Sequence, residues 1–359
     1  MKDVPPLDRA HELLERKNYD ALLITSRENN RYLSNFTGSD STLLIRAGDD
    51  AGYLYCDSRY TEQAKAECPK WRVIEYKNVV ESVAKKIVDL KLKKVGFESR
   101  NISYNLYHRY LQAIDNAVLV PIETLVDKLR ISKTEKELQL IEQAVKIAET
   151  AFDESIPLLK PGVKENEWAL LMESKMRSLG SEPLPFDIIV ASGQRGAMPH
   201  AKAAKAAIKK GDLVTIDFGA CYKGYASDTT NTVAVGKPNK EMVEIYQVVL
   251  DAHDMAIEAA KPGVELKKID AVARSYIDKK GFGKYFGHGL GHGVGLAVHE
   301  EPHLSPLVEG VLQEGAVVTV EPGIYIPGKG GVRIEDMIYV SADGPELLTT
   351  ISKELKIIQ

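Results

Sequence analysis

Two acids, Asp217 and Asp228, lie eleven residues apart in the segment VTIDFGACYKGYASDTTNTVAV. Asp217 belongs to an apolar, strand-like run, Asp228 to a run rich in Thr and Val, and a turn signal lies between them. A hairpin centred between Tyr222 and Lys223 would place the two carboxylates directly opposite each other, with Cβ atoms roughly 4.5–5.5 Å apart. Buried carboxylates at that spacing repel, so either one holds a proton or a cation lies between them. A divalent metal ion is the usual solution, and the segment therefore predicts a metal site.

The second half of the chain repeats this arrangement. The segment KKGDLVTIDFG matches QEGAVVTVEPG with an offset of 104 residues, which aligns Asp217 with Glu321. Glu335, in VRIEDMIYV, occupies the return strand as Asp228 does in the first copy, and the tetrapeptide KPGV also occurs twice. We interpret these matches as an internal duplication, helix–helix–hairpin in each copy, which brings four carboxylates together about a pseudo-twofold axis. Two unrelated surface hairpins with solvated acids would have no reason to align in this way.

Half of the eight histidines lie in one glycine-rich segment, FGHGLGHGVGLAVHEEPH, at 286–303. They are His288, His292, His299 and His303. The spacing of the first two matches a helical zinc motif, but the alternating glycines, each costing about 1 kcal/mol relative to Ala, disfavour a helix. We expect a glycine loop that leads into a strand and lets the backbone approach a ligand closely. A single histidine is more often structural, whereas four beside four aligned carboxylates indicate a site.

The candidate ligands are mostly hard oxygen donors. Two Asp, two Glu and one His suit Mn²⁺, Co²⁺ or Fe²⁺, with Zn²⁺ as a further possibility. Five protein ligands exceed the three that normally hold a single catalytic zinc ion. They suit two ions that share bridging carboxylates. In such sites the two ions lie about 3.5–4 Å apart and activate a water molecule. We therefore expect two divalent metal ions per chain, with Mn²⁺ or Co²⁺ favoured.

The motifs TIDFGA…GYASDTTNTVAVG, GHGLGHGVGLAVHE, VTVEPGIY and VRIED together resemble the creatinase/aminopeptidase-P/prolidase family of pita-bread metallopeptidases. They span most of residues 190–340, and NNRYLSNFTGSDSTLLI, DSRYTEQA and VGFES are similar to the N-terminal domain of its two-domain members. Bacterial and archaeal prolidases are the members that the chain resembles most. The resemblance implies an α/β N-terminal creatinase-like domain and an α+β pita-bread catalytic domain with an internal pseudo-twofold duplication.

The resemblance also implies roles for single residues. The metal ligands would be Asp217, Asp228, His292, Glu321 and Glu335, with Asp228 and Glu335 bridging the two ions. His200 would lie beside the substrate carbonyl, and His299 would form a hydrogen bond near the scissile bond. His288 would form a wall of the proline pocket, and Arg333 would steady the metal-site carboxylates. The proton of the reaction would pass through Glu321.

Two residues depart from the family pattern. Asn231 stands in SDTTNT where many bacterial members have arginine. His303 stands where some dipeptide-specific members have an arginine that binds the C-terminal carboxylate of the substrate. An imidazole lacks the guanidinium fork and is charged only part of the time near neutral pH. We assign His303 to substrate binding, and its identity slightly favours longer peptides over strict dipeptide specificity.

The implied function is a metal-dependent exopeptidase that hydrolyses Xaa–Pro bonds in proline-containing di- or oligopeptides, either as a dipeptidase or as an aminopeptidase P. Methionine aminopeptidase shares the catalytic fold but does not need the N-terminal domain, and creatinase lacks this metal set. A non-catalytic peptide- or protein-binding relative would have lost the ligands, which are all present here. Family members are commonly dimers in which one N-terminal domain helps to cover the partner's active site, so we expect a homodimer.

The composition of the 359 residues is that of an ordinary globular protein. Its 47 Lys and Arg against 51 Asp and Glu, a net charge of −4, give no electrostatic reason to expect nucleic acid or an anionic membrane as a partner. No apolar run approaches about 18 residues, and the start lacks the apolar segment of a signal peptide. Three cysteines form neither a disulfide framework nor a metal-spaced set. We therefore expect a cytoplasmic protein with reduced thiols and no transmembrane helix.

The domain boundary follows from a change of pattern. The strand-like runs ALLIT, TLLIR, GYLYC, VGFES and AVLVPI alternate with helical stretches up to about residue 126, which is an α/β pattern. Thr134 and Glu137 then match a capping box at the start of a long amphipathic helix. We place an N-terminal domain at 1–127 and the catalytic domain at 128–359.

Overall fold

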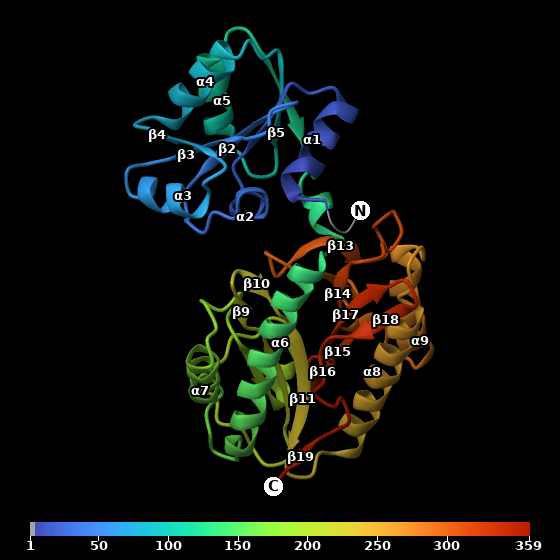
Figure 1. The fold of residues 1–359 in the computed structure, drawn as a ribbon. Coiled ribbons are helices and arrows are strands. Elements are labelled where there is room, and N and C mark those ends of the chain that lie inside the picture. The colour runs from blue at the N-terminus through green and yellow to red at the C-terminus, as the bar shows by residue number, and fades with distance from the viewer. Residues whose placement is uncertain (1–3) are drawn as a thin grey trace. The chain divides into compact units, whose positions relative to one another are not determined.

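The computed structural model describes residues 4–359. The chain forms two compact units, Met1–Arg130 and Ile131–Gln359 (Figure 1). The predicted domain limits, 1–127 and 128–359, remain a prediction. Among the described residues, no helix combines the length and the apolar character that crossing a membrane requires.

The N-terminal unit is a six-stranded mixed sheet in the order β4-β3-β2-β1-β5-β6 with helices between the strands. Its strands are β1 (Ala21–Ile24), β2 (Thr42–Arg46), β3 (Tyr53–Cys56), β4 (Arg72–Glu75), β5 (Lys94–Glu98) and β6 (Val118–Ile122). Its helices are α1 (Pro6–Lys17), α2 (Arg27–Ser34), α3 (Thr61–Glu67), α4 (Val79–Asp89), α5 (Tyr104–Ala113) and the 3₁₀ turn η1 (Asp127–Arg130). All five predicted strands are present. The sequence did not predict β4, because this edge strand is only partly buried and has no apolar run.

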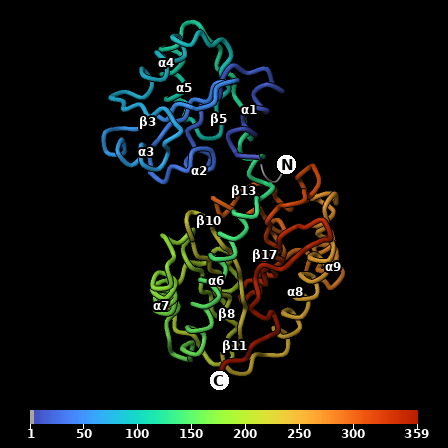
Figure 2. Tube along the Cα trace, viewed as in Figure 1, coloured from blue at the N-terminus to red at the C-terminus, as the bar shows by residue number. Residues whose placement is uncertain are grey.

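The C-terminal unit contains two pairs of long helices. Strands lie between the pairs (Figures 1 and 2). The helices are α6 (Glu135–Ser155), α7 (Glu165–Ser178), α8 (Lys240–Ala259) and α9 (Leu266–Lys279), with the 3₁₀ turns η2 (Ile156–Leu158), η3 (Gly193–Ala197) and η4 (Gly283–Tyr285). Helix α6 packs on α7, and α8 packs on α9. The predicted capping box is confirmed, since the Thr134 side chain accepts from the Glu137 N–H and the Glu137 carboxylate accepts from the Thr134 N–H.

Two antiparallel sheets carry the strands of this unit, apart from two short ribbons. The first sheet has the order β19-β11-β8-β7, where β7 is Ile189–Ser192, β8 Leu213–Phe218, β11 Thr229–Val235 and β19 Ile357–Ile358. The second has the order β13-β12-β14-β17-β18, where β12 is Gly291–Gly293, β13 Glu300–Leu304, β14 Val317–Val320, β17 Asp336–Ser341 and β18 Gly344–Leu347. The ribbons are β9 (Cys221–Tyr222) with β10 (Tyr225–Ala226), and β15 (Gly323–Ile326) with β16 (Gly330–Arg333). Apart from β19 pairing in parallel with β11, neighbouring strands in this unit are antiparallel.

Equivalent contacts in the two halves confirm the internal duplication. The N–H of Gly162 donates to the Ile208 carbonyl at 2.8 Å, and the N–H of Gly263 donates to the Leu312 carbonyl at 2.8 Å. Both glycines have a positive φ, 94° and 82°, which a residue with a Cβ adopts only with strain. The repeated KPGV therefore has the same role twice: it turns the chain between two helices, and it binds the segment that precedes β8 in the first copy and β14 in the second.

Candidate metal centre and substrate cleft

The first hairpin brings Asp217 and Asp228 together, but in a register that differs from the predicted one. Asp217 lies opposite Thr230, because the turn is centred between Lys223 and Gly224. Both turn residues have a positive φ, 47° and 84°, as a two-residue type I′ turn requires. The predicted direct pairing of Asp217 with Asp228 is therefore wrong. Since the shift is two residues, Asp228 keeps the same face and becomes a diagonal neighbour of Asp217.

The second hairpin has the direct pairing that the first one lacks. Strand β14 pairs with β17 as far as Val320 opposite Asp336, and β15 pairs with β16 in the same register. Glu321 and Glu335, the next residues on the two strands, therefore lie opposite each other. The two carboxylates are diagonal neighbours in the first hairpin and directly opposite each other in the second. All four nevertheless lie in one cluster.

The histidine segment contributes a short strand, β12, where the sequence predicted a glycine loop leading into a strand. Strand β12 lies between β13 and β14, and His292 pairs with His303 of β13. A Cβ on Gly291 would overlap the Thr319 carbonyl, and a Cβ on Gly293 would overlap the Glu301 carbonyl. Glycine at these positions allows the close approach of three strands, which places the His292 imidazole among the carboxylates.

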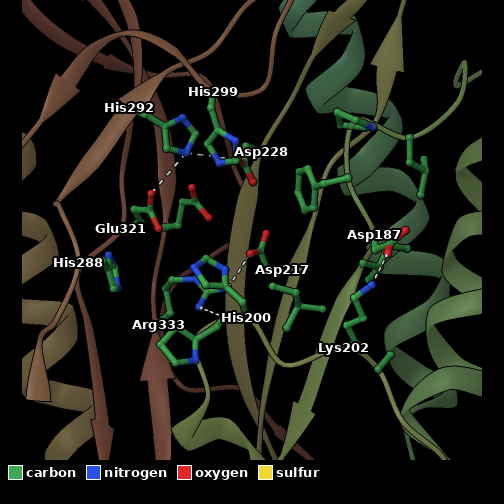
Figure 3. Close-up of a pocket in the computed structure, with 18 of the residues that line it drawn as sticks. Asp187, His200, Lys202, Asp217, Asp228, His288, His292, His299, Glu321 and Arg333 are labelled. Atoms are coloured by element: carbon green, nitrogen blue, oxygen red, sulfur yellow. Dashed lines mark hydrogen bonds and ion pairs between the residues drawn. The ribbon is translucent and has the colours of Figure 1, made fainter.

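All five predicted ligands converge in this way, and Figure 3 labels four of them, Asp217, Asp228, His292 and Glu321. Ligand atoms lie within 4.8 Å of one another in three groups, Asp217 with Asp228 and Glu335, His292 with Glu321 and Glu335, and Asp228 with His292 and His299. The His292 Nε2 atom is 3.4 Å from Oε1 of Glu321 and 3.6 Å from Oδ2 of Asp228. Two overlapping groups that share Glu335 are an arrangement in which one carboxylate can serve two ions.

The cluster gathers four acids around one buried arginine, Arg333, so the charged forms of several of these acids are unfavourable without a further cation. Burial raises the pKa of Asp228 well above its usual range, and the charges of Glu335, Asp217 and Glu321 raise it further. Burial likewise raises the pKa of Glu321, and it raises the pKa of Glu335 to about 7, with the Asp217 charge as the next cause. The Oδ1 atoms of Asp217 and Asp228 have no hydrogen-bond partner among the described residues. These buried oxygens and the oxygen-rich donor set fit a divalent cation.

The imidazole of His292 is suited to bind a metal ion. Burial, and then the neighbouring His299, lowers the pKa of His292 to about 3, so the ring is neutral. The neutral form is the one that binds metals. The rings of His292 and His299 are 4.3 Å apart between centroids. Burial also lowers the pKa of His299.

Arg333 joins the carboxylate cluster to its surroundings. Its side chain is buried, and Nη2 donates to Oδ2 of Asp217 at 2.6 Å, while Nε donates to the Thr230 hydroxyl at 3.0 Å. The Thr230 hydroxyl in turn donates to Oε2 of Glu335 at 2.7 Å. The Nη1 atom donates to the carbonyl of Pro199, next to His200, at 3.1 Å. One guanidinium thus connects an acid of each hairpin with the segment that carries His200.

Sequence reasoning missed Tyr325. Its buried hydroxyl accepts from Nη1 of Arg333 at 3.1 Å and lies 2.9 Å from Nε2 of His288. Burial lowers the pKa of His288 to about 4, so this ring is neutral. A signal was available, because Tyr325 is four residues after Glu321 on one strand path, and residues of equal parity share a face.

A cleft of about 1180 Å³ is lined by all ten predicted site residues. They are His200, Asp217, Asp228, His288, His292, His299, His303, Glu321, Arg333 and Glu335. The cleft continues away from the carboxylates to Leu170 and Arg177 on α7. His200 and His303 are exposed to it, whereas the carboxylates lie at its buried end. The arrangement can hold cations at one end and place several imidazoles around a bound molecule.

Comparisons with known proteins agree with this geometry. Residues 139–342 match the model of metallopeptidase family M24, and residues 6–132 match the creatinase/prolidase N-terminal domain. The Xaa-Pro dipeptidase of Pyrococcus horikoshii is 39% identical over 348 residues, which are 96% of each chain. A solved Xaa-Pro dipeptidase from Bacillus anthracis is 42% identical, with a TM-score of 0.94 over 98% of this chain and 99% of that one. An X-Pro aminopeptidase structure from Thermotoga maritima is 40% identical, with a TM-score of 0.92 over the same shares.

Proposed function

This chain belongs to metallopeptidase family M24, with a creatinase/prolidase N-terminal domain and a pita-bread catalytic domain, and we propose that it hydrolyses Xaa–Pro dipeptides with two metal ions. Membership of the family and the ligand groups together imply divalent metal ions. The observation that carries the proposal is the convergence of four carboxylates and His292 at the buried end of a cleft lined by further histidines. The relatives named Xaa-Pro dipeptidase, at 39% and 42% identity, support the substrate class.

Five residues hold the two ions in this proposal. They would be Asp217, Asp228, His292, Glu321 and Glu335, and the shared ligands would be Asp228 and Glu335, each of which belongs to two ligand groups. The oxygen-rich set suits Mn²⁺, Co²⁺ or Fe²⁺ better than Zn²⁺, and we propose Mn²⁺ or Co²⁺. When bound, such ions polarise the substrate carbonyl and make a water molecule a stronger nucleophile. Asp228 and Glu335 are buried and Glu321 is partly buried, and the charged forms of all three acids become favourable when cations lie beside them.

The other site residues act on the peptide. His200 and His299 donate hydrogen bonds to the carbonyl oxygen of Xaa, which gains negative charge in the transition state. Glu321 takes up the proton of the attacking water and passes it to the proline nitrogen, which becomes the leaving amine. His288, neutral and held by Tyr325, forms one wall of the pocket for the proline ring. Arg333 holds Asp217 in place.

A second candidate is an Xaa–Pro aminopeptidase that acts on longer peptides. The cleft extends to α7, and His303, which also lines it, stands where some dipeptide-specific members of the family have an arginine. The X-Pro aminopeptidase of Thermotoga maritima is nearly as similar as the dipeptidase of Bacillus anthracis. A homodimer and a cytoplasmic location are proposed on the family resemblance and the sequence alone.

The test compares three substrates after the purified protein has been loaded with Mn²⁺ or Co²⁺. Ala-Pro should be cleaved, Ala-Ala should be cleaved much more slowly, and the ratio of Ala-Pro to Ala-Pro-Ala distinguishes a dipeptidase from an aminopeptidase. Equal kcat/KM for Ala-Pro and Ala-Ala would contradict the Xaa–Pro assignment and leave a general peptidase. Elemental analysis of the same sample measures the number of bound ions.

A further inference from the structure

Two fully buried acids outside the carboxylate cluster, Glu165 on α7 and Asp270 on α9, each pair with an arginine. Neither acid lines the cleft. A buried carboxylate is costly unless hydrogen bonds and an opposite charge compensate it, so both need a structural or functional reason. In each half of the catalytic unit the pair fastens one segment of chain, and that segment contains a histidine that lines the cleft.

The first pair holds the segment around His200. Oε1 of Glu165 accepts from the N–H and the hydroxyl of Ser192 at 2.8 Å each, and Oε2 accepts from the Ala204 N–H at 3.0 Å. Nε of Arg195 donates to Oε2 of Glu165 at 2.9 Å, and Nη2 donates to the Lys202 carbonyl at 2.6 Å. These hydrogen bonds thus hold the chain on both sides of His200, at Ser192 eight residues before it and at Ala204 four residues after it.

The second pair holds the segment around His288. Arg274 donates from Nε to Oδ2 of Asp270 at 2.7 Å and from Nη2 to Oδ1 at 2.8 Å, a bidentate pair. The same guanidinium donates from Nη1 to the Phe286 carbonyl at 3.0 Å and from Nη2 to the His288 carbonyl at 2.7 Å. Oδ1 of Asp270 also accepts from the Leu290 N–H at 3.1 Å. The segment 286–290 is therefore bound directly on both sides of the histidine and at the histidine itself.

We propose that these two ion pairs are positioning devices, Glu165 with Arg195 for His200 and Asp270 with Arg274 for His288. The acids do not occupy equivalent positions in the repeat, since Glu165 is the first residue of α7 and Asp270 lies inside α9. What recurs is the arrangement, in which a buried acid on the second helix of each copy binds an arginine that donates to loop carbonyls. A guanidinium suits this task because its fork can bind a carboxylate and a carbonyl at the same time.

The proposal rests on the proposed function, in which His200 faces the reacting carbonyl and His288 the proline ring. It therefore predicts different kinetic effects for the two arginines. Arg195→Gln loosens a transition-state contact and should lower kcat for Ala-Pro by roughly 10-fold or more. Arg274→Gln loosens a wall of the binding pocket and should mainly raise KM. The matched control is Lys175→Gln, because Lys175 lies on α7 like Glu165 and forms an exposed ion pair with Glu154 of α6. It should change neither constant by more than about 2-fold.

A double-mutant cycle separates positioning from general stability. If Arg195 acts through His200, the penalty of Arg195→Gln should disappear in the His200→Ala background and persist in the His288→Ala background. The reverse should hold for Arg274→Gln, whose penalty should disappear only with His288→Ala. Equal penalties in both histidine backgrounds would show that the pair has only a structural role and would overturn the proposal. Where a glutamine variant fails to fold, the lysine variant at the same position enters the same cycle.

Hydrogen exchange gives a readout that does not depend on activity. Amides of residues 193–204 should exchange faster in Arg195→Gln, and those of 286–290 should exchange faster in Arg274→Gln, with the Lys175→Gln control unchanged. Unchanged exchange in both segments refutes the proposed clamps. If the metal-loaded wild type cleaves no Xaa–Pro peptide, the proposed function fails, whereas the exchange result still decides whether the ion pairs hold these two segments.

Discussion

Nη2 of Arg333 donates to Oδ2 of Asp217 at 2.6 Å, across 116 residues of sequence. The same guanidinium binds the hydroxyl of Tyr325, which in turn lies 2.9 Å from Nε2 of His288. A carboxylate of the candidate metal site is thereby connected to His288, the proposed wall of the proline pocket, through two buried side chains. A substitution that moves His288 or Tyr325 should therefore also change the position of the Asp217 carboxylate, through Arg333.

Tyr325→Phe tests this connection with the smallest possible change. The variant removes one hydroxyl, leaves the Arg333–Asp217 bond in place and frees the His288 ring to reorient. We expect kcat/KM for Ala-Pro to fall roughly 10-fold or more, because a buried hydrogen bond to a charged group contributes about 1.5–3 kcal/mol. Kinetics and metal analysis on the same preparation provide the measurement. Wild-type kcat/KM in the variant would mean that the hydroxyl does not orient these two side chains.

Asp228→Asn tests whether the carboxylates hold metal. The substitution keeps the size of the side chain but removes the charge of a residue that belongs to two of the ligand groups. We expect activity to be abolished and metal content to fall below that of the wild type. Asp153 is exposed on α6, so Asp153→Asn serves as the control and should change neither the activity nor the metal content. A fully loaded, active wild-type sample that contains one ion or none would contradict the two-ion proposal.

The stability of the metal-free protein should depend on pH through Glu335. Burial raises the pKa of this acid from 4.5 to about 7, so between these values the folded chain binds more protons than the unfolded chain. The contribution of Glu335 to stability must therefore fall as pH rises from about 4.5 to 7 and stay constant above that. Urea unfolding of the metal-free wild type and of Glu335→Gln measures it. The wild type should lose stability relative to the variant over this window, and a pH-independent difference would refute the assignment.

His303→Arg tests whether this residue binds the substrate's C-terminal carboxylate. His303 pairs with His292 across β12 and β13 and is exposed to the cleft. A guanidinium can bind a carboxylate with two charge-assisted hydrogen bonds, so the kcat/KM ratio of Ala-Pro to Ala-Pro-Ala should rise by about 10-fold. His303→Ala should lower the same ratio. If neither variant moves the ratio, His303 does not bind the substrate's C-terminus.

Much of the candidate site was predictable because it depends on residue types and on periodicity. The offset of 104 between the two hairpin segments aligned Asp217 with Glu321 without any coordinates. The turn and strand signals placed each acid on a hairpin, and the internal duplication predicted that the two hairpins would meet. Ligand chemistry then followed from the donors, since four carboxylates and one imidazole suit a narrow range of metal ions.

The tertiary structure decided which residues face each other. The sequence marks a turn near residue 222, but only the positive φ of Lys223 and Gly224 centres it one position later and sets Thr230 opposite Asp217. The tertiary structure likewise decided the close packing of β12 between β13 and β14 and the position of β4 at the edge of its sheet.

The contacts of Tyr325 and the two buried acid–arginine pairs were also beyond the reach of the sequence. Each of them joins or fastens segments whose meeting depends on how strands and helices pack. Periodicity records the face on which a side chain lies, whereas hydrogen bonding between distant segments depends on three-dimensional packing that no local pattern encodes.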